Sequence, residues 1–407
     1  MVIKPEKARF LTSLVLRLIL TRKCGFNSAY RVVVRRYGLS EQEAEQYYKL
    51  LYNIIMYYHT LKFTAGYHGF KPNIQGIVEY LYKKSFTWRL IEEDVEDAAK
   101  AFSKYTKIGL LYGYPQWFVK DLSRRVDLAE LESILSALNY KKRWLRVNTL
   151  KYSVEDAVLC LKNTGIETKP HEIFRDLLLQ RDPFKKIGGN LCFLKGVVIP
   201  QDIGSYIIGQ IAQNIATGEF LDACSAPGLK LIQVLGGSRA RRAIAVDLSG
   251  KRIKVLPKLL ELALGQISPL IIAIQGDSRK ITYSSKFHSA LLDAPCSNSG
   301  AIYDDPAIKV HLNRKLLERA HRIQYSLLSA LVKRSKLVLY ATCSIHPLEG
   351  EEVVEKLSRE HDVEIVKVNY PYLDSGYAGY TVSRSVHRVH PHRVQGQGFF
   401  VALIKSE

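Results

Sequence analysis

From Gln201 to the end of the chain, short apolar segments alternate with segments of helical periodicity, which limits the possible folds more than any other feature. The apolar segments are predicted strands, and they lie at residues 219–221, 243–246, 270–274, 290–292, 337–340 and 399–404. This alternation predicts a doubly wound α/β sheet with a mostly parallel core. Because such sheets bind ligands beyond the carboxyl ends of their strands, we expect the functional residues there.

The spacing of apolar residues divides the chain before this region into two further parts. Residues 8–137 place apolar side chains at helical spacing, and Ser40 followed by Glu43 predicts a capped helix start. Beyond Trp144 the sequence predicts a strand at 144–150, a helix at 154–163, and short strands around Ile173 and at 191–194. We therefore expect three domains. They are an all-α domain at 1–137, a small RRM-like α+β domain at 138–200 that packs on its neighbour, and a Rossmann-like catalytic domain at 201–407.

The charge of the chain is strongly basic and regional. Lys and Arg number 59 against 39 Asp and Glu, for a net charge of +20. Residues 1–36 hold nine basic side chains and one acid, Glu6, whereas residues 37–140 are almost neutral. Such a distribution favours a polyanionic partner. A surface that only aids solubility is the simpler alternative.

The cysteines and the apolar segments indicate the compartment. The six cysteines are scattered with no CxxC pair, so we expect neither a disulfide framework nor a zinc site. The longest apolar run near the start, residues 14–20, is short and contains Arg17, so no membrane segment is expected. The sequence thus predicts a cytoplasmic protein without a membrane partner.

Acidic residues follow three of the predicted strands. Asp222 precedes a turn at Gly228, Asp247 ends the second strand, and Asp277 ends the third. Any one of them could simply cap a helix, but the set predicts a site for an adenosine-bearing cofactor. The phosphate-binding motifs GxxxxGK[ST] and GxGxxG do not occur in the sequence, so the cofactor need not carry a pyrophosphate. This favours S-adenosylmethionine over NAD or ATP.

Two cysteines follow the next two strands. Cys296 stands three residues after Asp293, and Cys343 follows Thr342. A single cysteine is more often a small buried apolar residue, but two at neighbouring strand ends favour thiol chemistry. Methylation of pyrimidine carbon 5 needs a thiolate that adds to carbon 6 and a base that later removes the carbon-5 proton. Asp293 would hydrogen-bond the ring and Lys230 would favour the thiolate; the residues alone leave open which cysteine attacks.

A run of histidines and arginines lies near the end of the chain, at residues 384–393. It could be a metal cluster, but neither a carboxylate nor a cysteine joins it. We interpret it as a loop that contacts phosphates, and we predict no metal site.

The ordered motifs of residues 140–407 resemble the RNA 5-methylcytosine methyltransferase family, the group related to the Nol1/Nop2/Sun proteins. The resemblance rests on residues 146–151, Lys195-Gly196, Gln201-Asp202, Ser205, residues 222–230, Asp247 with Arg252, Asp277, residues 293–297, residues 342–344 and residues 398–402. It implies that Cys343 is the nucleophile and Cys296 the release cysteine, with Asp293 and Lys230 as the other catalytic residues. The cofactor-binding residues expected are Asp222, Ala223, Cys224, Ala226, Pro227, Gly228, Lys230, Asp247, Arg252, Asp277 and Asp293.

Residues 1–137 more loosely resemble the NusB-like domain that precedes this catalytic region in the bacterial small-subunit rRNA enzyme. The resemblance implies an RNA substrate, with rRNA preferred and tRNA as the alternative. No obligate protein partner is evident in the sequence, and we expect a monomer. A non-catalytic RNA-binding assembly factor is the other alternative. The chain departs from the family pattern at Leu229, Leu231, Asn298, Gly350 and Gln397.

Overall fold

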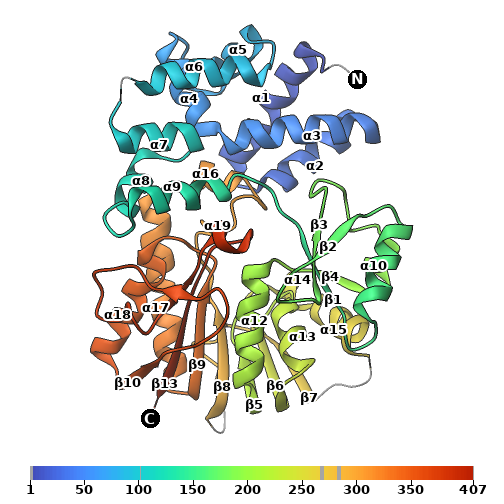
Figure 1. The fold of residues 1–407 in the computed structure, drawn as a ribbon, viewed down its shortest axis with the longest axis vertical. Coiled ribbons are helices and arrows are strands. Elements are labelled where there is room, and N and C mark those ends of the chain that lie inside the picture. Colours follow the sequence, from blue (N-terminus) through green and yellow to red (C-terminus); the bar gives the residue numbers. More distant parts are fainter. Residues whose placement is uncertain (1–2, 101, 266–269, 282–285, 407) are drawn as a thin grey trace. The chain divides into compact units, whose positions relative to one another are not determined.

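The computed structural model describes residues 3–100, 102–265, 270–281 and 286–406 (Figure 1). By their internal contacts the residues form two units, Met1–Tyr140 with Ala301–Asn313 and Lys141–Gly300 with Arg314–Glu407. The segment 301–313, which follows the Cys296 motif, thus groups with the N-terminal helices. None of the described helices is long and apolar enough to span a membrane.

The first unit is helical, as its apolar spacing predicts. Ser40 accepts a hydrogen bond from the Glu43 amide and forms the predicted capping box. The helices are α1 (Pro5–Arg22), α2 (Phe26–Tyr37), α3 (Glu41–Met56), α4 (Tyr58–Tyr67), α5 (Ile74–Lys83), α6 (Trp88–Lys100), α7 (Lys104–Tyr112), α8 (Gln116–Leu122), α9 (Leu128–Ala137) and α16 (Ala307–His311).

A buried lysine fixes α16 inside this helical unit. Lys309 is fully buried, and its Nζ donates to the carbonyl oxygen of Tyr112 at 2.6 Å, to that of Met56 at 3.2 Å and to Asn139 Oδ1 at 2.5 Å. Burial lowers its pKa well below the ordinary value of a lysine. Since three acceptors satisfy the amine, the segment 301–313 is part of the core of the helical unit.

The second unit begins with a small antiparallel sheet of order β2-β3-β1-β4. Its elements are β1 (Trp144–Val147), α10 (Val154–Asn163), β2 (Thr168–Pro170), β3 (Leu177–Gln180), α11 (Leu191–Leu194) and β4 (Val198–Pro200). The helix at 154–163 is confirmed. The predicted strand at 191–194 is wrong, because Asn190 caps a one-turn helix there by accepting from the Cys192 amide. The strand predicted around Ile173 is also wrong, since that residue is exposed between β2 and β3.

The prediction that the cysteines form no disulfide is wrong for one pair. Cys160 in α10 and Cys192 in α11 are bonded, with their Cα atoms 6.0 Å apart. They are 32 residues apart in sequence, and only the packing of the two helices brings their sulfurs together. The other four cysteines are free.

Three polar contacts, two of them buried, tie the small sheet to the rest of the second unit, as the packing prediction requires. Trp144 Nε1 donates to the carbonyl oxygen of Gln395 at 2.9 Å. Arg146 Nε donates to Gln201 Oε1 at 2.6 Å, and Asn148 Nδ2 donates to the carbonyl oxygen of Ala263 at 3.0 Å.

The large sheet has the order β11-β12-β13-β9-β8-β5-β6-β7, with β10 paired to β13. Strands β5 to β9 are parallel, and β13 runs antiparallel to β9, so the predicted mostly parallel core is confirmed. The strands are β5 (Thr217–Asp222), β6 (Arg239–Asp247), β7 (Leu270–Gln275), β8 (Phe287–Asp293), β9 (Ser335–Thr342), β10 (Val363–Val366), β11 (Asp374–Ser375), β12 (His387–Val389) and β13 (Phe399–Ser406).

Helices cover both faces of this sheet, because successive strand side chains point to opposite sides. Phe220 belongs to the core cluster that includes Leu231 of α13, whereas Leu221 belongs to the cluster that includes Leu328 of α17. The helices are α12 (Ile203–Ile215), α13 (Leu229–Leu235), α14 (Gly250–Ile253), α15 (Leu256–Leu264), α17 (Arg314–Val332), the 3-10 helix η1 (Pro347–Glu349), α18 (Glu351–Glu360) and α19 (Pro391–Val394).

Candidate functional site

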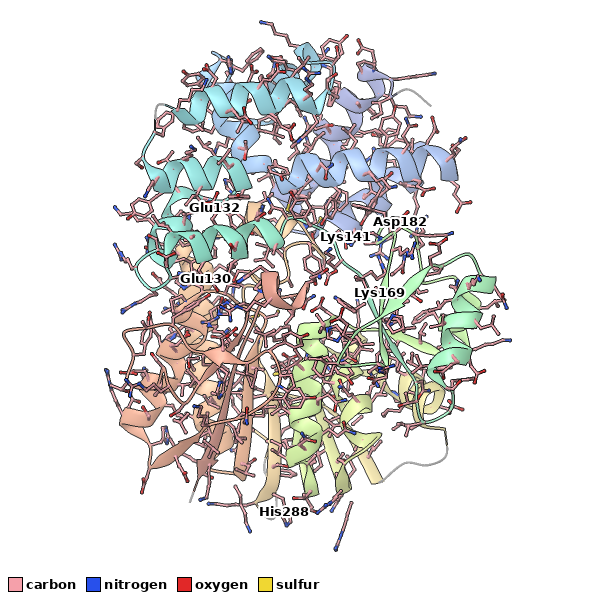
Figure 2. The ribbon with its side chains drawn as sticks, viewed as in Figure 1. Glu130, Glu132, Lys141, Lys169, Asp182 and His288 are labelled. Carbon is pink, nitrogen blue, oxygen red and sulfur yellow. A yellow bond between two sulfur atoms is a disulfide. The ribbon has the colours of Figure 1, made fainter. Side chains whose placement is uncertain are left out.

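A cavity of about 410 Å³ lies at the carboxyl ends of the parallel strands. Neighbouring strands β5 and β8 meet where the strand order reverses direction, and they end in Asp222 and Asp293, which both line the cavity. Ligands of open α/β sheets bind at this position. His288, near the start of β8, lies at the opposite edge of the sheet (Figure 2).

The cavity collects nearly all of the predicted cofactor-binding residues. Those that line it are Asp222, Ala223, Cys224, Ala226, Pro227, Lys230, Asp247, Arg252, Asp277 and Asp293. Gly228 is not among the lining residues. It has a φ of +106°, and a Cβ there would meet Leu256 Cδ1 at 2.1 Å, so it shapes the turn that leads into α13. Lining residues that the sequence analysis missed include Ser225, Leu248, Ser278 and Arg279.

Asp222 is the most strongly perturbed acid of the cavity. It is 1% exposed, and its Oδ1 has no hydrogen-bond partner among the described residues. Burial raises its pKa to about 7, from an ordinary value of 3.8. An unpaired buried acceptor needs a donor or a cation, and S-adenosylmethionine carries an ammonium, a sulfonium and hydroxyl groups. The chemistry and the size of the cavity therefore fit this cofactor.

This pKa makes the stability of the protein depend on pH. Between about pH 4 and 7 the folded state keeps the Asp222 proton that the unfolded chain loses, so stability falls as the pH rises through this window. The free energy of unfolding, measured by urea titration, should fall between pH 5 and pH 8 in the wild type. This fall should be about 2 to 3 kcal/mol larger than in Asp222→Asn, whose side chain at this position cannot ionise. Equal losses in the two proteins would contradict this expectation.

The other two predicted cofactor acids have polar partners of their own. Asp247 accepts from the Ala226 amide at 3.1 Å and the Ser249 amide at 2.8 Å, which holds the loop after β5 against the end of β6. Asp277 forms an ion pair with Arg279 at 2.5 Å, and this hydrogen bond lowers the pKa of Asp277. These contacts hold both carboxylates in place in the lining of the cavity.

Lys230 and Asp293 form an ion pair in the lining of the cavity. Lys230 Nζ lies 2.7 Å from Asp293 Oδ2. Burial alone would lower the pKa of Lys230, but the Asp293 carboxylate outweighs it and the pKa is raised. Lys230 therefore carries a charge near the thiols, as the sequence analysis expects, although Asp293 compensates part of it.

The two predicted cysteines are in contact. Cys296 Sγ and Cys343 Sγ are 3.4 Å apart, and both residues line the cavity. Their closeness follows from the parallel pairing of β8 and β9, in which Asp293 is opposite Ala341. The hydrogen bond with Cys343, followed by burial, raises the pKa of Cys296 well above its ordinary value.

Glu349 joins the two cysteine loops, and the sequence analysis missed it. This buried carboxylate accepts from the Ser297 amide at 2.7 Å, from Ser344 Oγ at 2.6 Å and from Gln324 Nε2 at 3.2 Å. Burial raises its pKa, and the hydrogen bonds oppose that shift. Because Ser297 follows Cys296 and Ser344 follows Cys343, one carboxylate holds both loops. The signal in the sequence was an acid shortly after the second cysteine motif, beside Gly350.

The interpretation of residues 384–393 as a phosphate-contacting loop is wrong for its buried members, His387, Arg388 and His390. Arg388 Nε donates to Glu351 Oε1 at 2.9 Å, and its Nη1 donates to the carbonyl oxygen of Ser344 at 2.7 Å. The strand β12 pairs with β13 and turns these side chains inward. Within the described part of the chain, no group of three or more His, Cys, Asp or Glu residues could hold a metal ion.

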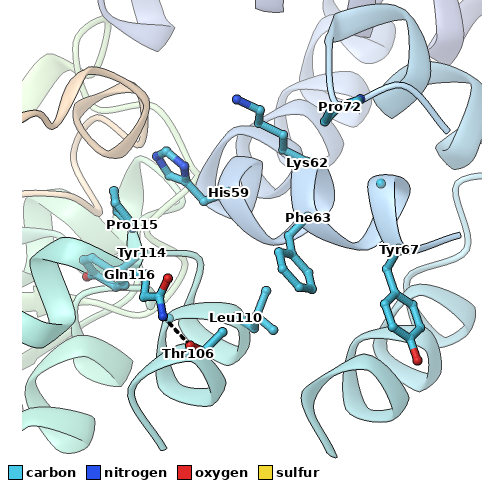
Figure 3. A pocket seen from close by; sticks show the side chains of 12 residues that line it. His59, Lys62, Phe63, Tyr67, Pro72, Thr106, Leu110, Tyr114, Pro115 and Gln116 are labelled. Atoms are coloured by element: carbon cyan, nitrogen blue, oxygen red, sulfur yellow. Dashed lines mark hydrogen bonds between the residues drawn. The ribbon is translucent and has the colours of Figure 1, made fainter. Parts of the chain in front are cut away.

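A second cavity, of about 520 Å³, lies in the helical unit (Figure 3). Phe63, Tyr67 and Leu110 supply much of its lining, and no carboxylate or thiol is among the described residues that line it. His59 Nε2 donates to the carbonyl oxygen of Lys309 at 2.9 Å, and burial lowers the pKa of His59 to about 4. Of these two cavities, only the one at the large sheet therefore combines carboxylates and thiols among its described lining residues.

Comparisons with known proteins agree with this geometry. Residues 212–405 match the family model of the 16S rRNA methyltransferase RsmB/F, and residues 114–184 match the ferredoxin-like domain of the RsmF/B-like methyltransferases. Together the two models cover more than half of the chain. The second match begins within the helical unit, before the predicted domain start at 138.

Individual relatives agree as well. Ribosomal RNA small subunit methyltransferase B of Serratia proteamaculans is 29% identical over 371 residues, which cover 88% of this chain and 80% of that protein. The crystal structure of PH0851 has a TM-score of 0.76 at 20% identity, with both chains covered completely. A methyltransferase homologue from Pyrococcus horikoshii has a TM-score of 0.64 at 24% identity, covering 75% of this chain and 100% of that one.

The two solved structures support the fold, and the family models support the Rossmann-like methyltransferase region together with its ferredoxin-like domain. The acids and the cysteine pair lie in the matched region, in a cavity that fits the cofactor. This chain belongs to the RsmB/F family of S-adenosylmethionine-dependent methyltransferases.

Proposed function

We propose that this protein methylates carbon 5 of a cytosine in ribosomal RNA through a covalent adduct with Cys343. The observation that carries the proposal is the contact between two thiols at the carboxyl ends of β8 and β9, 3.4 Å apart, in the cavity that holds the strand-end acids. A single buried cysteine would have a simpler explanation, whereas two thiols in contact beside a charged lysine suit addition followed by release.

The residues have separate tasks in this reaction. Cys343 adds to carbon 6 of the base as a thiolate, which makes carbon 5 nucleophilic. Bound S-adenosylmethionine supplies the methyl group. Asp293, which is held by Lys230, would hydrogen-bond the ring and stabilise the addition. Cys296 first gives up its own proton to solvent, and its raised pKa makes the resulting thiolate strongly basic. This thiolate takes the carbon-5 proton, the electron pair of that bond re-forms the double bond between carbons 5 and 6, and Cys343 leaves carbon 6 as a thiolate.

Ribosomal RNA is the favoured substrate for two reasons. The relative from Serratia proteamaculans is a ribosomal RNA methyltransferase. In addition, Arg31, Arg35 and Arg36 of α2 are exposed in the helical unit, which we assign as the RNA-docking domain. The cytosine must leave any stack to reach Cys343, so an opened or single-stranded site is expected. This substrate implies a cytoplasmic location.

The test is methyl transfer from labelled S-adenosylmethionine to a mixed pool of unmodified rRNA and tRNA. We expect the label in 5-methylcytosine of rRNA. Label in tRNA would keep the chemistry and overturn the substrate. If neither RNA is labelled although the folded protein binds RNA, the non-catalytic assembly factor becomes the better explanation.

Replacing the release cysteine should trap the reaction halfway. In Cys296→Ser the adduct between Cys343 and the RNA forms, but the carbon-5 proton is removed slowly, because a hydroxyl is a far weaker acid than a thiol and is a base only at high pH. A denaturing gel should show a slowly migrating protein–RNA band. The band should be missing from the double variant Cys296→Ser, Cys343→Ala, and from Cys24→Ser, which changes a free cysteine of the helical unit. A Cys296→Ser protein that turns over without the band would contradict the assigned roles.

A further inference from the structure

Asn298 is an exposed residue with an unusual backbone conformation in the loop of Cys296. Its φ is +58°, in the left-handed region that favours glycine. Asparagine is one of the few residues other than glycine that adopt this conformation readily. The backbone therefore tolerates an asparagine here, and what distinguishes this residue is the reach of its side chain.

The Asn298 side chain reaches both thiols. Its Oδ1 accepts a hydrogen bond from Cys343 Sγ at 3.0 Å and lies 3.6 Å from Cys296 Sγ. The two sulfurs are themselves 3.4 Å apart, so the amide oxygen and the sulfurs form a triangle at the rim of the cavity. The left-handed backbone directs the side chain toward this triangle.

We propose that Asn298 is a positioning residue that holds Cys343 as a protonated thiol beside Cys296 until the substrate enters. A carbonyl oxygen accepts the S–H proton but repels a thiolate, so the contact favours the neutral form of the nucleophile. It also fixes the direction of the S–H bond. The importance of this role for methyl transfer rests on the proposed function, whereas the contact itself does not.

The test is the alkylation of Cys343 by iodoacetamide in the full-length protein, without RNA or cofactor, with each cysteine followed by peptide mass spectrometry. The informative variant is Asn298→Gly, which removes the amide and suits the backbone, so it should fold at least as well as the wild type. We expect Cys343 to react about three- to fivefold faster at pH 7.5. Its rate-against-pH profile should shift to lower pH, a shift that a purely structural role would not cause.

Two further variants sharpen the result. Asn298→Asp places a carboxylate beside the sulfurs and should slow the alkylation of Cys343 below the wild-type rate. Gln395→Gly changes another exposed residue of positive φ in the same unit and should leave the rate unchanged. An unchanged or slower rate in Asn298→Gly would overturn the proposal. Because the readout needs no methyl transfer, failure of the proposed function would appear separately, in the transfer assay.

Discussion

Cys343→Ala should abolish methyl transfer, with a loss of about four orders of magnitude or more, because no other group can make carbon 5 of the base nucleophilic. Cys296 should not take over, because burial still raises the pKa of its thiol when the hydrogen bond with Cys343 is gone, so its thiolate stays scarce. The measurement is the initial rate of label transfer to unmodified rRNA under single-turnover conditions.

The control for this variant separates chemistry from binding. Cys343→Ala should bind S-adenosylmethionine in a calorimetric titration as the wild type does, and Cys24→Ala should transfer the label at the wild-type rate. Transfer by Cys343→Ala within tenfold of the wild type would show that the sulfur of Cys343 does not form the adduct.

Glu351→Gln should destabilise the catalytic unit by about 3 to 5 kcal/mol, because it leaves the charge of Arg388 buried without a counter-ion. The side chains of Glu351 and Arg388 are 0% and 2% exposed. Burial would lower the pKa of Arg388, and the Glu351 carboxylate more than offsets this, so the pKa is raised. The measurement is the free energy of unfolding from urea titrations followed by circular dichroism.

An exposed ion pair of the same sheet is the matched control. Glu364 and Lys405 pair across β10 and β13 at 3.1 Å with more than half of each side chain exposed, so Glu364→Gln should cost less than about 1 kcal/mol. Because Arg388 also holds the carbonyl oxygen of Ser344, next to Cys343, methyl transfer by Glu351→Gln should fall as well. If Glu351→Gln lowers the free energy of unfolding as little as Glu364→Gln does, the buried ion pair contributes little to stability.

Periodicity predicted the elements that are long or flanked by clear boundary residues. The helix at 154–163, the capping box at Ser40 and the parallel strands ending in Asp222, Asp247 and Asp293 are examples. The prediction failed at Leu191–Leu194, where four apolar residues fit a strand and a helical turn equally well. Asn190 stabilises the helical turn, because its side chain accepts a hydrogen bond from the Cys192 amide at the start of the helix.

The candidate site also contains residues that the sequence predicted and residues that it did not. The acids and cysteines stand at the carboxyl ends of predicted parallel strands, and parallel strands bring those ends to one edge, so their assembly in one cavity follows from the sequence pattern. Glu349 was missed because its role depends on Ser297 and Ser344, which come from two separate loops. The charges at 384–393 were misjudged because a composition rich in arginine does not say which side chains point inward.

The sequence by itself determined the alternation of parallel strands and helices beyond Gln201, the residues at the ends of those strands and the basic character of the N-terminal region, since these depend on local spacing and charge. Only the tertiary structure decided the Cys160–Cys192 disulfide, the burial of Arg388 and Lys309, and the contact of Asn298 with both thiols. Each of these joins residues that are far apart in the chain or that differ only in the direction of a side chain. Local periodicity carries no information about such pairs, because packing selects them after the elements have formed.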